Sequence, residues 1–147
     1  MNVRKILVAV DFSAHSDKAV EDGIDLAKRF DAELHLVHAF DVPVPMVTPY
    51  EVAVPTGFVE QAREAAKKRL QELEEKVRAA GSDVHAHLTE APAAHAVARA
   101  AEELGVDLIV MGTRGNTGLK HVILGSVAER TLRLAPCSVL TVKTADD

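Results

Sequence analysis

The sequence predicts an α/β fold, a three-layer sandwich formed by one domain over residues 1–147. Short apolar runs typical of buried strands alternate along the chain with segments whose apolar residues recur at helical spacing. This strand–helix unit occurs four times before a closing strand, and helices of about a dozen residues force parallel crossovers. The length of 147 residues, with 48% hydrophobic and 27% charged residues, suits a single globular core.

The first half of the chain predicts two strands, each followed by a helix. Residues 6–10 (ILVAV) form a short apolar run that ends at an aspartate, as in a strand buried on both faces. Apolar side chains then recur at helical spacing over residues 14–30. Residues 33–40 (ELHLVHAF) predict the second strand. An apolar stripe over 59–77 predicts a long helix that stops at Gly81.

The second half of the chain repeats this order. Residues 106–111 (VDLIVM) predict the most strongly buried strand. Pro92 suits the first turn of a helix that Gly105 closes, and Ser126 and Glu129 have the spacing of a capping box at the start of the next helix. The predicted elements are a strand at 83–88, a helix from Pro92 to Leu104, the strand at 106–111, a helix at 126–134 and a last strand at 138–142.

Composition and charge exclude several classes of function. Lysine and arginine number 17 against 22 acidic residues, a formal net charge of −5, so we expect no nucleic-acid partner. No apolar stretch approaches ~18 residues, so we expect no membrane insertion. The single cysteine, Cys137, excludes an intramolecular disulfide and suits a reducing, cytoplasmic compartment.

A glycine cluster follows the strand at 106–111, although the dinucleotide, phosphate-loop, zinc-protease and nucleophile-elbow motifs are all absent. Four of the eight glycines lie within residues 112–125, just before a predicted helix. Glycines let the backbone turn with positive φ and approach a ligand closely, and a helix N-terminus presents N–H groups to an anion. Arg114 adds a guanidinium, with Lys120 and His121 nearby, so the segment predicts a phosphate site. The alternative is a plain connection whose Ser126 only caps the helix.

One irregular stretch, residues 41–57, interrupts the pattern and contains four of the six prolines. It leaves the carboxyl end of the second strand, the side at which parallel α/β sheets bind ligands. Two interpretations stay open for it: a surface excursion, and a proline-stiffened segment that covers a bound ligand.

The histidines give a weaker signal. His85 and His87 alternate on one face of a predicted edge strand, which could chelate a metal, but solvent-facing polar positions are the favoured interpretation. His35 and His38 point to opposite faces of their strand and form no pair. We assign no catalytic and no metal-ligating residue to this chain.

The glycines follow the spacing Gly112-x2-Gly115-x9-Gly125-Ser126, which resembles the nucleotide-binding motif G-x2-G-x9-G-[ST] of the universal stress protein family. The segments KILVAVDFS, LVHAFD and RLAPCSVLTVK resemble the same family, so the likeness runs nearly from end to end. It implies a five-stranded parallel sheet of order 3-2-1-4-5, usually in a dimer. It also implies ATP or AMP, with Mg²⁺ on the phosphates, bound between the first and fourth strands.

The resemblance further implies roles for ten residues around the nucleotide. Asp11 would meet the ribose hydroxyls or a metal on the phosphates, and a plain helix N-cap is the alternative for it. Ala9 and Ala39 stand where the family commonly has bulkier residues. The adenine would be flanked by Val10 and Ala39, the ribose by Met111 and Gly112, and the phosphates by Arg114, Gly115, Gly125, Ser126 and Val127.

Binding phosphates is not in itself catalysis, because hydrolysis also needs a placed water or base. The sequence offers no nucleophile with a paired base. We therefore expect an ATP-binding regulatory module in the stress response, whose nucleotide alters a surface that an unidentified protein partner reads. The main alternative is a weak ATP-hydrolysing or adenylyl-transferring enzyme of the same fold group, and a ligand-free scaffold is the third. The exposed apolar edge of the last strand, 138–142, predicts a homodimer.

Overall fold

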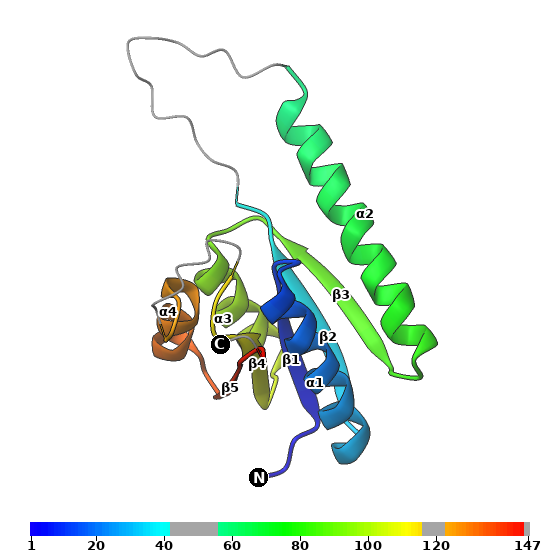
Figure 1. Ribbon diagram of the computed structural model, residues 1–147, viewed down its shortest axis with the longest axis vertical. Coiled ribbons are helices and arrows are strands. Elements are labelled where there is room, and N and C mark those ends of the chain that lie inside the picture. Colours follow the sequence, from blue (N-terminus) through cyan, green and yellow to red (C-terminus); the bar gives the residue numbers. More distant parts are fainter. Residues whose placement is uncertain (42–55, 116–122, 146–147) are drawn as a thin grey trace.

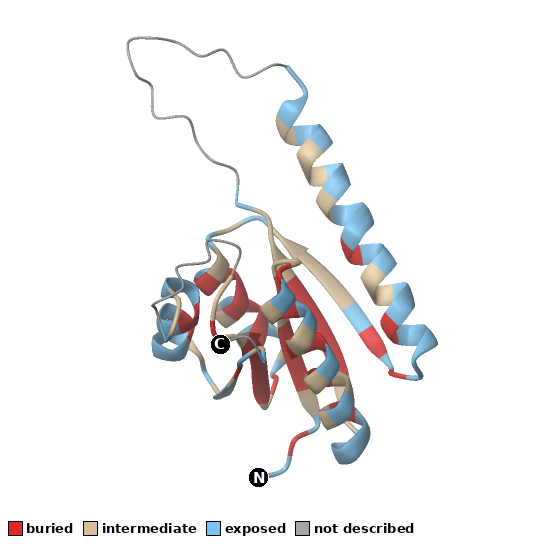
Figure 2. Cartoon of the chain, viewed as in Figure 1, coloured by how far each residue is buried: buried red, intermediate tan, exposed pale blue. Residues whose placement is uncertain are grey.

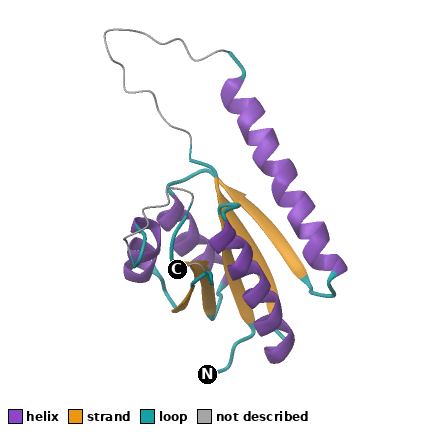
Figure 3. Ribbon diagram, viewed as in Figure 1, coloured by secondary structure: helices purple, strands orange, loops and turns teal. Residues whose placement is uncertain are grey.

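The computed structural model describes residues 1–41, 56–115 and 123–145, and contains a five-stranded sheet with helices on both faces (Figures 1 and 3). None of the helices in these ranges combines the length and the apolar content that a membrane crossing requires. In chain order the elements are β1 (Lys5–Val10), α1 (Ala14–Phe30), β2 (Glu33–Ala39), α2 (Phe58–Ala79), β3 (Val84–Thr89), α3 (Ala93–Leu104), β4 (Leu108–Gly112), α4 (Ser126–Leu134) and β5 (Ser138–Val142).

The strands lie in the order β3-β2-β1-β4-β5, and every neighbouring pair is parallel. This confirms the predicted fold class and strand order. The chain builds the sheet outward from β1 to β3 and then returns to the other side of β1 with β4. The connections from β1 and β4 therefore leave in opposite directions, and ligands of open α/β sheets bind at such a reversal.

Side chains of β1 alternate between two hydrophobic cores. Ile6, Val8 and Val10 pack with residues of α1 and α2, whereas Leu7 packs with residues of α3. None of these four side chains is more than 4% exposed. The central strand is therefore buried on both faces, as its apolar run predicts. Figure 2 shows this buried centre in red, while much of α2 is pale blue and exposed.

The starts of two elements, α3 and β4, differ from the prediction. Pro92 is not in the first turn of α3 but one position earlier, as its N-cap, with φ −54° and ψ 138°. Its carbonyl oxygen accepts a hydrogen bond from the Ala96 N–H at 2.9 Å. β4 begins at Leu108 rather than Val106, because the Val106 N–H donates to the Ala101 carbonyl in the turn that ends α3. The other bounds agree within two residues.

Side chains of α2 close the outer edge of the sheet at β3. The Ala86 N–H donates to the Glu74 carboxylate at 3.1 Å, and the Arg78 guanidinium donates to the Val84 carbonyl at 3.1 Å. Arg78 also donates to Glu74 at 3.2 Å. This pair thus engages one N–H and one carbonyl of β3 that a further strand could otherwise use. At the opposite edge, on β5, the side chain of Leu140 is 40% exposed.

Candidate functional site

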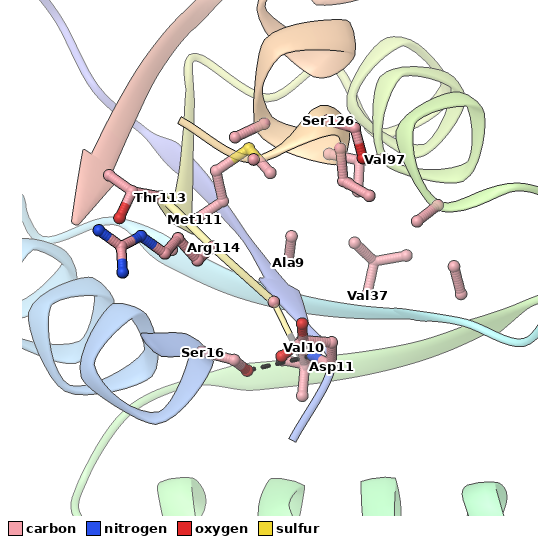
Figure 4. Close-up of a pocket in the computed structure, with 17 residues that line it drawn as sticks. Ala9, Val10, Asp11, Ser16, Val37, Val97, Met111, Thr113, Arg114 and Ser126 are labelled. Atoms are coloured by element: carbon pink, nitrogen blue, oxygen red, sulfur yellow. Dashed lines mark hydrogen bonds between the residues drawn. The ribbon is translucent and has the colours of Figure 1, made fainter. Parts of the chain in front are cut away.

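A cavity of about 240 Å³ opens at the carboxyl ends of β1 and β4, where the strand order reverses (Figure 4). Apolar side chains of the lining come from β1, β2 and α3, and polar ones come from the loops after β1 and β4 and from the starts of α1 and α4. The apolar residues include Ala9, Val37, Ala39, Ala93 and Val97, and the polar ones are Asp11, Ser16, Thr113, Arg114 and Ser126.

All ten residues to which the family resemblance gives a role line this one cavity. They come from four stretches of chain that the fold brings together: the end of β1, the end of β2, the end of β4 with its loop, and the start of α4. Their roles toward a ligand stay predictions. The ten are Val10, Asp11, Ala39, Met111, Gly112, Arg114, Gly115, Gly125, Ser126 and Val127.

Asp11 is held in the cavity wall by the turn between β1 and α1. Its Oδ1 accepts hydrogen bonds from the N–H of Ser13 at 2.9 Å and from the Ser13 hydroxyl. The Asp11 N–H donates to the Ser16 hydroxyl at 3.1 Å, the dashed line in Figure 4. Ser13 itself is the N-cap of α1, because its Oγ accepts from the Ser16 N–H at 3.2 Å. The N-cap alternative for Asp11 is therefore wrong.

At the glycines of the motif, neighbouring atoms lie too close to leave ordinary room for a side chain. A Cβ built on Gly115 would lie 2.5 Å from Oδ2 of Asp11, and one on Gly112 would lie 2.6 Å from Cβ of His15. A Cβ on Gly125 would lie 3.2 Å from the Thr113 carbonyl oxygen. None of these three glycines has a positive φ, so the close approach of neighbouring atoms explains them and a left-handed turn does not.

Helix α4 begins at the cavity, but without the predicted capping box. Its N-cap is Gly125, Ser126 is already the first helical residue, and no side chain of a described residue caps the end. The Gly125 N–H donates to the Thr113 carbonyl at 2.7 Å, which ties the helix start to the end of β4. The capping-box prediction is wrong because the cap lies one residue earlier. Ser126 lines the cavity instead, beside a helix end whose first N–H groups suit an anion.

Sequence reasoning missed part of the cavity wall. Val37 lies two residues before Ala39 on the same face of β2, so strand alternation could have found it. Val97 is brought in only by the packing of α3 on the sheet. Thr113 is 3% exposed, and its hydroxyl has no hydrogen-bond partner among the described residues, which favours a polar ligand there. The missed residues are Ser16, Val37, Ala93, Val97, Thr113 and Ala128.

Three histidines form a separate cluster on β2 and β3. His35 is 4% exposed, its Nδ1 lies 3.0 Å from Nε2 of His87, and its ring centroid lies 5.4 Å from that of His85. His85 is exposed, as expected, whereas His87 is half-buried against His35. Burial lowers the pKa of both His35 and His87. Across the part of the chain that the structure describes, no three His, Cys, Asp or Glu residues are arranged to hold a metal ion.

Two predictions fall outside the described residues. Most of the segment 41–57, one interpretation of which is a cover over a ligand, lies within 42–55. Lys120 and His121, the additional cations of the glycine segment, lie within 116–122. Both stay predictions.

Comparison with known proteins agrees with this fold. The model of the universal stress protein family matches residues 2–143. Universal stress protein MJ0531 of Methanocaldococcus jannaschii is 38% identical over 143 residues, which are 95% of this chain and 82% of that protein. The structure of the protein MJ0577 has a TM-score of 0.85 at 26% identity and covers 100% of both chains. A universal stress protein in complex with cAMP has a TM-score of 0.73 at 23% identity, over 99% of this chain and 100% of that one. The chain thus belongs to the universal stress protein family.

Proposed function

We propose that this chain is an ATP-binding regulatory module, in which the bound nucleotide changes a surface that a partner protein reads in the stress response. The observation that carries the proposal is the cavity at the reversal of strand order. Its apolar lining from β1, β2 and α3 suits a base, and the N–H groups at the start of α4 suit phosphates. AMP would occupy the same base and ribose positions as ATP.

In this proposal the base and the ribose take the half of the cavity nearest the sheet. The adenine would be flanked by Val10 and Ala39, whose neighbours in the wall are apolar. The ribose would follow Met111 and Gly112. The carboxylate of Asp11, which lines the cavity beside them, would accept hydrogen bonds from the ribose hydroxyls.

The phosphates would lie among Arg114, Gly115 and the residues 125–127. The absence of side chains at the glycines leaves room for them, and the buried Thr113 hydroxyl adds a donor. Mg²⁺ would neutralise phosphate charge in this position. Asp11 is the only carboxylate among the described lining residues, so phosphate oxygens and water would supply most of the ligands of the ion.

The same residues favour binding over turnover. Efficient phosphoryl transfer needs a placed base and concentrated positive charge on the leaving group. Among the described lining residues, Asp11 is the only carboxylate, and its Oδ1 already accepts two hydrogen bonds from Ser13. Arg114 is the only cation of that set. We therefore propose that ATP hydrolysis, where it occurs, is slow.

We also propose that the chain forms a homodimer through the edge of β5. Glu74 and Arg78 engage backbone groups at the β3 edge, whereas three leucines on α4 and β5 expose apolar surface. An isologous contact between two such edges gives two-fold symmetry. The leucines are Leu132, Leu134 and Leu140, which are 45%, 41% and 40% exposed. A cytoplasmic site of action fits the single cysteine.

The test has two parts. Small molecules released on denaturing the purified protein would be identified by mass spectrometry. Calorimetry would then measure the binding of ATP, AMP and cyclic AMP with and without Mg²⁺, while phosphate release is followed. Cyclic AMP is the ligand of one structure of this fold. Co-purified adenine nucleotide, or ATP binding without appreciable phosphate release, would support the regulatory module. Rapid phosphate release would favour the enzyme, and no binding at all would leave a scaffold.

A further inference from the structure

The turn that carries Asp11 contains a bulky residue in an unfavourable backbone conformation. Phe12, directly after Asp11, has φ +61°. Non-glycine residues rarely adopt the left-handed region, and a large side chain there is strained unless its surroundings hold it. Asp31 is the only other described non-glycine residue with a positive φ, and it ends α1 as the C-cap, which is an ordinary place for such an angle. Phe12 has no such explanation.

Two side chains from different elements hold the Phe12 ring. The ring of His38, near the end of β2, lies 4.7 Å from it between centroids. The guanidinium of Arg69, on α2, lies 4.2 Å from its centroid, which is a cation–π contact. His38 is fixed in turn, because its Nδ1 lies 2.7 Å from the Val10 carbonyl oxygen. The backbone on both sides of Asp11 is thus anchored to β2 and α2.

These anchors bear directly on the Asp11 carboxylate. Its Oδ1 is engaged by Ser13, just beyond Phe12, and its Oδ2 faces the Cα of Gly115, where a Cβ would lie only 2.5 Å away. A change of the φ angle at Phe12 would move Ser13 relative to Asp11 and would rotate the carboxylate. The position of Asp11 in the cavity therefore depends on the backbone conformation that the Phe12 ring maintains.

We propose that Phe12 is a positioning residue for recognition of the ribose: its ring, in contact with His38 and Arg69, keeps the turn in the conformation that presents the Asp11 carboxylate to the sugar hydroxyls. The inference rests on the proposed nucleotide function and deepens it. It also connects α2, an exposed helix, to the interior of the site. The ring acts through Asp11 and does not itself line the cavity.

The experiment compares the affinities for ATP and for 2′,3′-dideoxy-ATP, which lacks both sugar hydroxyls. The wild-type chain should prefer ATP about tenfold or more, the usual effect of a hydrogen bond to a charged group. Phe12→Gly accepts the positive φ but removes the ring. In this variant the preference should fall below about threefold, whereas the affinity for dideoxy-ATP should stay within about twofold of the wild type. Phe12→Tyr, which keeps the ring, should retain the preference.

Arg69→Gln gives a second test that does not threaten the fold, because Arg69 is exposed. It should lower the preference for ATP about two- to fivefold, the usual worth of an exposed cation–π contact. Lys67→Gln, an exposed cation on the same helix, is the matched control and should change nothing. The inference is overturned if Phe12→Gly and Arg69→Gln keep the wild-type preference, or if they weaken both nucleotides equally. A wild-type chain that binds ATP without preferring it would also overturn the inference, whereas one that binds no nucleotide would overturn the proposed function as well.

Discussion

A single methyl group at residue 115 should separate nucleotide binding from folding. In Gly115→Ala the new Cβ would lie 2.5 Å from Oδ2 of Asp11, whereas ordinary contacts begin at 3.4 Å. Asp11 is a short side chain whose Oδ1 is held by Ser13, so it cannot swing away without breaking those hydrogen bonds. A lost hydrogen bond to a charged group costs about 1.5–3 kcal/mol.

We therefore expect Gly115→Ala to weaken ATP binding about 10- to 100-fold in a calorimetric titration. The free energy of unfolding in urea should fall by about 1.5–3 kcal/mol, because the Asp11 carboxylate is pushed out of its hydrogen bonds with Ser13. The fold itself should persist, since Gly115 has no positive φ and belongs to neither core. Gly105→Ala is the matched control. Its φ of +63° makes a side chain strained although the space is open, so it should lose about 1 kcal/mol of stability and keep its ATP affinity. If Gly115→Ala binds ATP as tightly as the wild type, the assigned site is wrong.

Three further predictions concern the sheet and its edges. Burial lowers the pKa of His35 and His87 below 6.5 in the folded chain, so the unfolded chain binds more protons. Stability measured by urea unfolding should therefore fall as the pH drops from about 6.5, by at most ~1.4 kcal/mol per pH unit for each histidine. His87→Gln should flatten that slope, and an unchanged slope would contradict the account. Glu74→Ala should cost about 1 kcal/mol in the same assay, because the Ala86 N–H loses its acceptor; equal stability would mean that water replaces the carboxylate. Leu140→Asp should convert a dimer to monomer in analytical ultracentrifugation, and a persisting dimer would move the interface elsewhere.

The elements of the fold could be predicted because their signals are local. The apolar run of β1 and the helical spacing of α1 need no knowledge of distant residues, and both were predicted within one residue. The errors lie where a hydrogen bond decides the boundary. By residue type, Pro92 and Ser126 each fit either a cap or the first turn of a helix. The hydrogen bonds of the folded chain make Pro92 the cap before α3 and Ser126 the first residue inside α4.

The cavity could be predicted in part for a related reason. The glycine spacing identifies the motif residues after β4, and the resemblance to the universal stress protein family supplies the roles of Val10, Asp11 and Ala39. The remaining wall depends on contacts between distant elements: Val97 reaches the cavity through the packing of α3, and the Thr113 hydroxyl is recognisable only once it is seen to be buried without a partner. The Phe12 turn belongs to the same class. No local signal indicates a positive φ at a phenylalanine, which depends on His38 and Arg69 from other parts of the chain.

The closed edge at β3 sets a limit on how many copies can join through their sheets. Glu74 accepts from the Ala86 N–H and Arg78 donates to the Val84 carbonyl, so a strand added at β3 would have to displace both side chains. If two molecules pair at β5, as proposed above, both ends of the combined sheet are β3 strands that carry these contacts. Further growth by strand addition would then be disfavoured, whereas a sheet with two open edges could extend into a filament. In the proposed dimer, the two side chains that stabilise β3 would thus also oppose assembly beyond two copies.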